Sequence, residues 1–233
     1  MIILLMLFIL VFLMCFPAWY RQWQWLRWKK NLNVVIHEQP FLNITRPYNG
    51  FLISQQARKG RERFEDVYGE IDWLSFVDLM SVVTLKPESV FYDLGSGTGK
   101  NVLLCAMVFD IKKSCGVEQF EMLHHAAVAQ QQELSGLLAY QQKAAGIYFI
   151  CGDFLNEHFN DATVVFINST AYFGDTWVNI SKKLETVLTC EVIITTSKKL
   201  VSTVYRVTQE KKVQMSWGVV LAYIHERVNF LKQ

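Results

Sequence analysis

FYDLGSGTGKN, residues 91–101, joins the end of an apolar run to the start of a helix-like pattern. Asp93 closes the apolar run, and Gly95, Gly97 and Gly99 follow at alternate positions. Glycines spaced this closely indicate a backbone that bends tightly and that a ligand can approach. A plain turn from a strand to a helix would normally need only one glycine. We therefore interpret this stretch as a strand end, a ligand-binding loop and the start of a helix.

Short apolar runs and helical patterns alternate on the C-terminal side of this loop. We expect strands near 89–93, 114–118, 147–151, 163–168 and 191–196, separated by helices over roughly 99–109, 120–143 and 175–188. A further helix is expected over 71–80, and two strand-like runs follow residue 200. The pattern predicts an α/β, Rossmann-like fold with a mostly parallel, seven-stranded sheet and an antiparallel hairpin at one edge.

The glycine spacing bears on the class of ligand. A phosphate-binding Walker loop requires a first glycine where Leu94 stands and a hydroxyl where Asn101 stands, so both of its key positions differ. A dinucleotide fingerprint has the spacing GxGxxG, whereas this loop has GxGxG, and the charge of Asp93 would oppose a pyrophosphate. A cationic nucleoside fits better. We predict S-adenosylmethionine, whose ammonium and sulfonium groups are attracted by a carboxylate.

The ends of the next two strands fit the same ligand. Glu118 ends the second strand about 20 residues after the glycine loop, which is the spacing of a carboxylate that binds a ribose. Asp153 and Phe154 follow the third strand and offer an acceptor and an aromatic face to an adenine. Gly99 and Lys100, which end the glycine loop, complete the contacts predicted from this part of the sequence.

Residues 1–20 contain no charged side chain and are long enough for a helix that crosses a bilayer. Tryptophans, Lys and Arg crowd residues 19–30, so we predict an uncleaved transmembrane anchor with a cytoplasmic C-terminal side and a single-pass membrane location. A buried N-terminal helix of a soluble domain is the alternative. The predicted domains are an anchor (1–20), a basic lead-in segment (21–66) and a cofactor-binding domain (67–233).

Charge, cysteines and histidines add a few limits. The net charge is only +2, but residues 1–64 hold most of the excess of Lys and Arg over Asp and Glu. The run QARKGRER (56–63) is either a solvated face or a patch that binds phosphate or a partner, nucleic acid included. The five cysteines are scattered and are interpreted as reduced core thiols. The adjacent pair His124 and His125 does not share a helix face, so we predict no metal site.

Several motifs resemble, in order, those of the disruptor-of-telomeric-silencing type of lysine methyltransferase, the non-SET class that modifies a lysine of the nucleosomal histone core. These motifs are VYGEIDWL (67–74), FYDLGSGTGKNVLL (91–104), GVEQ (116–119), GDFLNEHF (152–159), VFINSTAYFG (165–174), TSKKL (196–200), MSWG and AYIH (215–225). The resemblance covers residues 67 to about 226. It implies a class I methyltransferase fold that uses S-adenosylmethionine.

The resemblance also implies roles for individual residues. Tyr68 and Glu70 would line the methionine end of the cofactor together with Asp93, Gly95 and Gly97, Glu118 would hold the ribose, and Asp153 and Phe154 the adenine. Asn168 matches the family's active-site asparagine. The predicted catalytic residues are Asn168, Phe166, Tyr172, Trp217 and Tyr223, of which Phe166, Tyr172 and Trp217 would form a channel for the substrate lysine. Ala222 stands where the family has the first tyrosine of a pair.

We therefore expect an S-adenosylmethionine-dependent protein-lysine N-methyltransferase, tethered to a membrane, that acts on a protein substrate such as a histone. Two alternatives stay open at this stage. The acceptor is a small molecule or another non-histone amine, or the chain binds the cofactor without catalysis, which the alanine at position 222 would explain. A nuclear location follows if the histone interpretation holds.

Overall fold

The computed structural model of the chain describes residues 32–60 and 63–228. It divides into two compact units after Pro40, and the sheet and the cavities described below belong to the unit that starts at Phe41. The helices are α2 (Val34–Thr45), α3 (Gly50–Ala57), η1 (Phe64–Asp66), α4 (Trp73–Met80), α5 (Lys100–Val108), α6 (Glu121–Ser135), η2 (Leu138–Tyr140), α7 (Gln141–Ala145) and α8 (Gly174–Glu185).

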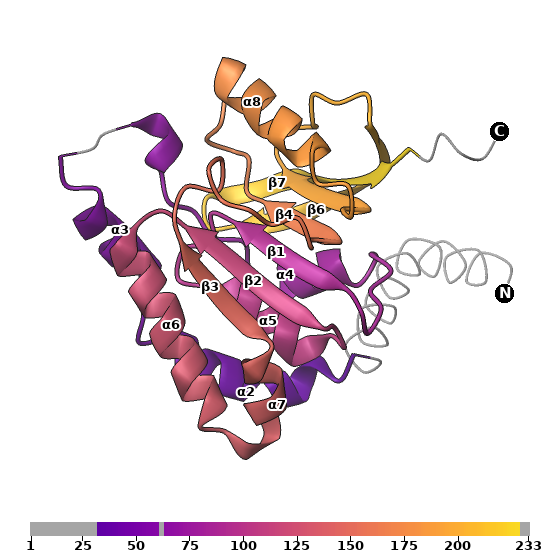
Figure 1. Cartoon of the computed structure of the whole chain (residues 1–233). Helices are drawn as coiled ribbons and strands as arrows, with labels where there is room; N and C mark the ends of the chain where they lie inside the picture. The colour runs from indigo at the N-terminus through magenta and orange to yellow at the C-terminus, as the bar shows by residue number, and fades with distance from the viewer. Residues whose placement is uncertain (1–31, 61–62, 229–233) are drawn as a thin grey trace, which may run out of the picture. The chain divides into compact units, whose positions relative to one another are not determined.

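The strands are β1 (Val90–Leu94), β2 (Lys113–Glu118), β3 (Ile147–Cys151), β4 (Val164–Ile167), β5 (Val192–Thr196), β6 (Tyr205–Met215) and β7 (Gly218–Arg227). They form one sheet in the order β3-β2-β1-β4-β5-β7-β6, and Figure 1 shows β3, β2 and β1 side by side. The first five strands are parallel, and β7 pairs antiparallel with both β5 and β6. The predicted mostly parallel sheet with an antiparallel edge hairpin is confirmed.

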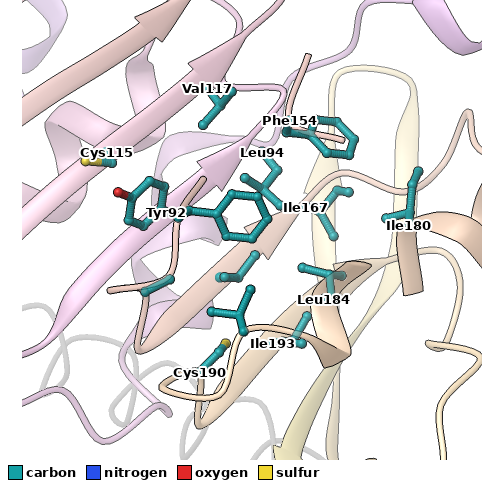
Figure 2. Close-up of a cluster of buried hydrophobic side chains, with 14 of the residues drawn as sticks. Tyr92, Leu94, Cys115, Val117, Phe154, Ile167, Ile180, Leu184, Cys190 and Ile193 are labelled. Atoms are coloured by element: carbon teal, nitrogen blue, oxygen red, sulfur yellow. The ribbon is translucent and has the colours of Figure 1, made fainter. Parts of the chain in front are cut away.

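The side chains of β1 point alternately to two faces of the sheet, because successive residues of a strand face opposite sides. Tyr92 and Leu94 join a buried cluster with β2, β4 and α8, including Val117, Ile167 and Ile180 (Figure 2). On the other face, Phe76 of α4 packs edge-on against Phe91 and Phe166. A helix layer on each face leaves the carboxyl ends of β1, β2 and β4 as the place where the chain can form a site.

Two local features differ from the sequence prediction. The expected helix over 120–143 is broken, because α6 ends at Ser135 and Gly136 follows before η2 and α7 begin. The lead-in segment contains α3, which begins after Asn49; the Asn49 side chain accepts a hydrogen bond from Leu52 N and caps the helix.

Within residues 32–60 and 63–228, no helix has both the length and the hydropathy that a membrane crossing requires. The predicted fold with a transmembrane helix and the predicted single-pass membrane location are therefore corrected: the structure shows a Rossmann-like sheet without a spanning helix in its described part. The stretch that motivated the anchor, residues 1–20, lies outside the described residues.

Candidate active site

A cavity of about 480 Å³ opens at the carboxyl ends of β1, β2 and β4, next to the point where the strand order reverses. Parallel sheets bind ligands at such switch points because the loops after neighbouring strands diverge there. The predicted residues that line it are Tyr68, Glu70, Asp93, Gly95, Gly97, Lys100, Glu118, Asp153, Phe154, Phe166, Asn168, Tyr172 and Trp217. The structure therefore brings together segments that are far apart in the sequence.

The glycine loop forms the floor of this cavity. Gly95 and Gly97 have φ values of 82° and 56°, which side chains with a Cβ rarely adopt. Gly95 N donates to Val117 O over 2.8 Å, so the loop is tied to the end of β2. A Cβ on Gly97 would lie 2.8 Å from Cε2 of Tyr68. The tyrosine ring can rest on the loop only because glycine stands there.

Two buried carboxylates face the cavity from the ends of β1 and β2. Burial raises the pKa of Asp93 to about 7, against the lowering effect of a 3.1 Å hydrogen bond from Asn101 Nδ2 and with a smaller raising effect of the charge of Glu118. Burial also raises the pKa of Glu118, whose oxygens accept hydrogen bonds from Gly97 N (2.8 Å) and Phe120 N (2.9 Å). A cationic ligand would relieve the cost of burying these charges.

The segment from Tyr68 to Ile71 covers one side of the cavity. Tyr68 Oη donates to Glu70 Oε1 over 2.7 Å, and Lys100 Nζ donates to both carboxylate oxygens of Glu70 over 2.8 Å. Burial raises the pKa of Tyr68 well above its ordinary value, so the hydroxyl remains a donor. A Cβ on Gly69 would lie 2.0 Å from Cζ3 of Trp217, so glycine is required for the indole to lie against this segment.

Asn168, directly after β4, is held at both ends of its amide. Asn168 Nδ2 donates to Gly69 O over 3.3 Å, and Asn168 Oδ1 accepts from Thr196 Oγ1 over 2.7 Å. Ala222 of β7 lies opposite Thr196 and is fully buried. The structure therefore places the alanine that replaces the family's tyrosine beside the residue that orients Asn168.

The predicted aromatic residues lie in different surroundings. Tyr172 packs edge-on against Phe154, with ring centroids 6.0 Å apart, and burial raises the pKa of its hydroxyl. Phe166 borders the cavity but is almost completely buried, whereas 46% of Trp217 is exposed. Of the three predicted channel residues, Tyr172 and Trp217 are thus the two that a second substrate could touch.

Two predicted site residues are not among those that line the cavity. Gly99 precedes α5 with φ 81°, and a Cβ there would lie 2.8 Å or less from Phe149 and Ala127, so this glycine permits close packing of the loop on β3 and α6. Tyr223 lies on β7, pairs with Thr195, and lies under the ammonium of Lys199 at 5.1 Å from its ring centroid. Their predicted roles in cofactor binding and catalysis gain no support from this placement.

Sequence reasoning missed the residues just before Tyr68. Asp66 has a fully buried side chain, accepts hydrogen bonds from Arg63 Nε and Nη2 over 3.1 and 3.0 Å, and accepts a third from Gln119 Nε2 over 3.2 Å. Arg63 therefore forms its hydrogen bonds within the chain, and Arg58 does the same, because its Nε donates to Ser54 Oγ. The predicted nucleic-acid contact through these arginines is not supported. Glu65 accepts a hydrogen bond from Thr176, and each of these two residues lines the cavity.

We predict that Asp66→Asn lowers the free energy of unfolding by about 2 kcal/mol, because it weakens a buried, charge-assisted contact that joins the segment 63–68 to the end of β2. Urea unfolding at pH 7 measures the change. Asp72→Asn serves as the control, since its side chain caps α4 by accepting from Ser75 N, a bond that an asparagine retains. Equal stability of Asp66→Asn and the unmodified chain would contradict the prediction.

Comparison with known proteins agrees with this arrangement. The family model described as "Histone methylation protein DOT1" matches residues 53–222. A histone-lysine N-methyltransferase of Caenorhabditis elegans, H3 lysine-79 specific, is 32% identical over 145 residues, which are 58% of this chain and 15% of that protein. The enzyme of the same description from Drosophila melanogaster is 31% identical over 135 residues, 55% of this chain and 7% of that protein. The chain thus spans a small part of these relatives.

The fold has structural neighbours outside that family. A candidate RNA methyltransferase from Pyrococcus horikoshii superposes with a TM-score of 0.50 at 14% sequence identity, over 67% of this chain and 83% of that one. At this identity the likeness concerns the fold alone. Because the family model covers the glycine loop, both buried carboxylates and the Asn168 segment, the chain belongs to the DOT1 histone methylation family and has the Rossmann-like fold of class I methyltransferases.

Proposed function

We propose that the chain is an S-adenosylmethionine-dependent N-methyltransferase whose acceptor is a lysine of a protein, with a histone as the first candidate. The observation that carries the proposal is the pair of buried carboxylates, Asp93 and Glu118, that flank a glycine loop in a cavity of about 480 Å³. Cavities of this size are typical of sites for drug-sized ligands. Family membership supports the same activity.

The residues present fit the cofactor. Asp93 is 2% exposed, and its pKa is raised because burial disfavours the charged carboxylate. An ammonium group bound beside it would stabilise that charge. Glu118 would hold the ribose hydroxyls, and Phe154, with Asp153 beside it, the adenine. Gly95, where the nearest atom to a Cβ would be Tyr172 Oη at 3.8 Å, leaves room for close approach of the ligand to the backbone. When bound, S-adenosylmethionine supplies the electrophilic methyl group, so the chain itself has mainly to bind and orient.

The acceptor amine must lose its proton before it attacks, since an ordinary lysine has a pKa near 10.4. Tyr172 and Trp217 would place the lysine side chain between aromatic surfaces, where desolvation favours the neutral amine. Asn168, fixed by Thr196 and Gly69, presents a polar group that can orient that amine. No side chain of the site is needed as a nucleophile.

The histone acceptor is inferred from the relatives, which are described as H3 lysine-79 specific. The test is methyl transfer from radiolabelled S-adenosylmethionine to recombinant nucleosomes, free histones, and a lysate extracted free of protein. Label on a histone lysine, lost in Asn168→Ala, supports the proposal. Label confined to small molecules would make the proposed acceptor wrong, and no label with S-adenosylhomocysteine still bound would indicate a binding protein without catalysis.

A further inference from the structure

The segment between β4 and α8, residues 168–173, contributes Asn168 and Tyr172 to the cavity although it contains no helix or strand. The main-chain hydrogen bond that joins two residues of the segment is from Tyr172 N to Ser169 O, at 3.2 Å, and a second links Trp177 N of α8 to Phe173 O at 3.4 Å. A loop that must hold reacting groups to a fraction of an ångström needs support from neighbouring groups. The support comes from residues 196–198, at the end of β5.

Lys198 is the principal contact. Its ammonium donates to the main-chain carbonyls of Ser169 over 3.1 Å and Thr170 over 2.8 Å, and to the carbonyl of Tyr172. An ammonium group has three protons and no acceptor, so one loop uses its whole hydrogen-bonding capacity. Lys198 is not among the described residues that line the cavity.

The neighbours of Lys198 bind the same loop. Nζ of Lys198 lies 3.3 Å from the ring centroid of Phe173, so the loop supplies an aromatic face as well as three carbonyls. The hydroxyls of Thr170 and Ser197 are 2.7 Å apart, and Ser169 Oγ donates to Thr196 O. With the bond from Thr196 to Asn168, residues 196–198 contact nearly every residue of the segment.

We propose that Lys198 is a positioning residue of the active site: its charge gathers three carbonyls of the 168–173 segment and thereby sets the placement of Asn168 and Tyr172 without touching substrate or cofactor. Without the ammonium, three carbonyls that point toward one another would repel and the loop would relax. The consequence for catalysis rests on the proposed function. The consequence for the order of the loop does not.

The shape of the side chain matters as well as its charge. A lysine ammonium is a compact group whose three protons can point to three converging carbonyls, whereas an arginine presents its protons in a planar fork. An arginine at position 198 would therefore keep the charge but lose part of the bonding. This difference provides a second variant for the test.

The chain offers a matched control in the next residue. Lys199 is exposed and pairs with Glu210 on β6, with 2.8 Å between Nζ and Oε1, so its removal changes the charge equally but leaves the loop untouched. The experiment compares the unmodified chain, Lys198→Met and Lys199→Met. It measures amide hydrogen exchange of residues 169–173, affinity for S-adenosylhomocysteine, and kcat and KM on nucleosomes.

We expect Lys198→Met alone to speed exchange at residues 169–173 by about 10-fold or more, while β1 and β5 keep their protection. We expect its kcat to fall by about 10-fold or more, with changes under about 3-fold in KM and in affinity for S-adenosylhomocysteine. A general loss of stability would instead change exchange throughout the sheet and weaken binding. Should Lys198→Met fail to fold, Lys198→Arg is measured in its place, and we expect changes in the same direction but smaller, because the charge remains.

The outcomes separate this proposal from the proposed function. Unchanged exchange at 169–173 in the Lys198 variant, or the same change in Lys199→Met, would overturn the positioning role. If the unmodified chain methylates no histone, the proposed function fails, and the exchange measurement still decides whether Lys198 orders the loop. Faster exchange with an unchanged kcat would show that the loop's order is irrelevant to catalysis and would also overturn the proposal.

Discussion

Asp93→Asn is expected to weaken binding of S-adenosylhomocysteine by about 100-fold, because it removes the carboxylate that we assign to the ligand's ammonium group. A hydrogen bond to a charged group contributes about 1.5–3 kcal/mol, and about 100-fold corresponds to the upper part of that range. The same variant is expected to raise the melting temperature of the ligand-free chain at pH 8. Calorimetry and thermal unfolding measure the two effects.

The loss of ligand affinity and the gain in thermal stability both follow from the pKa of Asp93, which burial raises to about 7 from its ordinary value of 3.8. The folded chain therefore keeps this proton over a pH range in which the unfolded chain has lost it. The contribution of Asp93 to stability is largest below about pH 4, falls as the pH rises through 7, and is then constant. An asparagine side chain has no proton to lose in this range, so the stability of the Asp93→Asn variant should lack this dependence.

Cofactor affinity should change with pH in the other direction. The ionised carboxylate binds the ligand, so affinity for S-adenosylhomocysteine is expected to rise from pH 6 to pH 8 by about 10-fold and to level off above the pKa. Asp110→Asn, a change at an exposed residue outside the cavity, is the control and should resemble the unmodified chain. Strong binding by Asp93→Asn, or loss of binding in the control, would contradict the assignment.

Those parts of the site that depend on short stretches of sequence were predictable. The glycine loop and the carboxylates at the ends of β1 and β2 follow from strand ends and spacing, since parallel strands bring their carboxyl ends to one edge. The segment around Asp66 was not predictable in this way. Its partner Gln119 is 53 positions away, and only the folded chain shows that the two side chains meet.

Two residues illustrate the limits of motif reasoning within the site itself. Gly99 belongs to the glycine motif, but the structure uses its missing Cβ for packing against Phe149 and Ala127. Lys198 belongs to the TSKKL motif, and nothing in the sequence distinguishes it from Lys199. The difference lies in the loop carbonyls around the ammonium of Lys198 and the exposed carboxylate of Glu210 beside that of Lys199, which is a property of the tertiary structure alone.

The second large effect on cofactor affinity is expected at the carboxylate of the ligand's amino-acid group, opposite the ammonium that Asp93 would bind. Of the described residues that line the cavity, only Arg63 and Lys100 carry a permanent positive charge, and Arg63 is held by Asp66. Lys100 Nζ donates to both carboxylate oxygens of Glu70, and because an ammonium has three protons, one remains for a further acceptor. We assign Lys100, which directly follows Gly99 of the glycine loop, to the ligand's carboxylate. Asp93, which we assign to the ammonium group, and Lys100 together present the two charges that complement a free amino-acid end, which suits the ligand that we propose.

Lys100→Met is expected to weaken binding of S-adenosylhomocysteine by about 50-fold, because the ligand's carboxylate would lose its cation and face an uncompensated Glu70. An analogue that lacks only that carboxylate should bind the variant at least as well as it binds the unmodified chain. Lys86→Met, a change at an exposed lysine outside the cavity, should leave both affinities unchanged. A cation that binds the ligand's carboxylate must account for the preference for S-adenosylhomocysteine over the analogue. If Lys100→Met kept that preference by the original factor, the carboxylate would be bound by another residue.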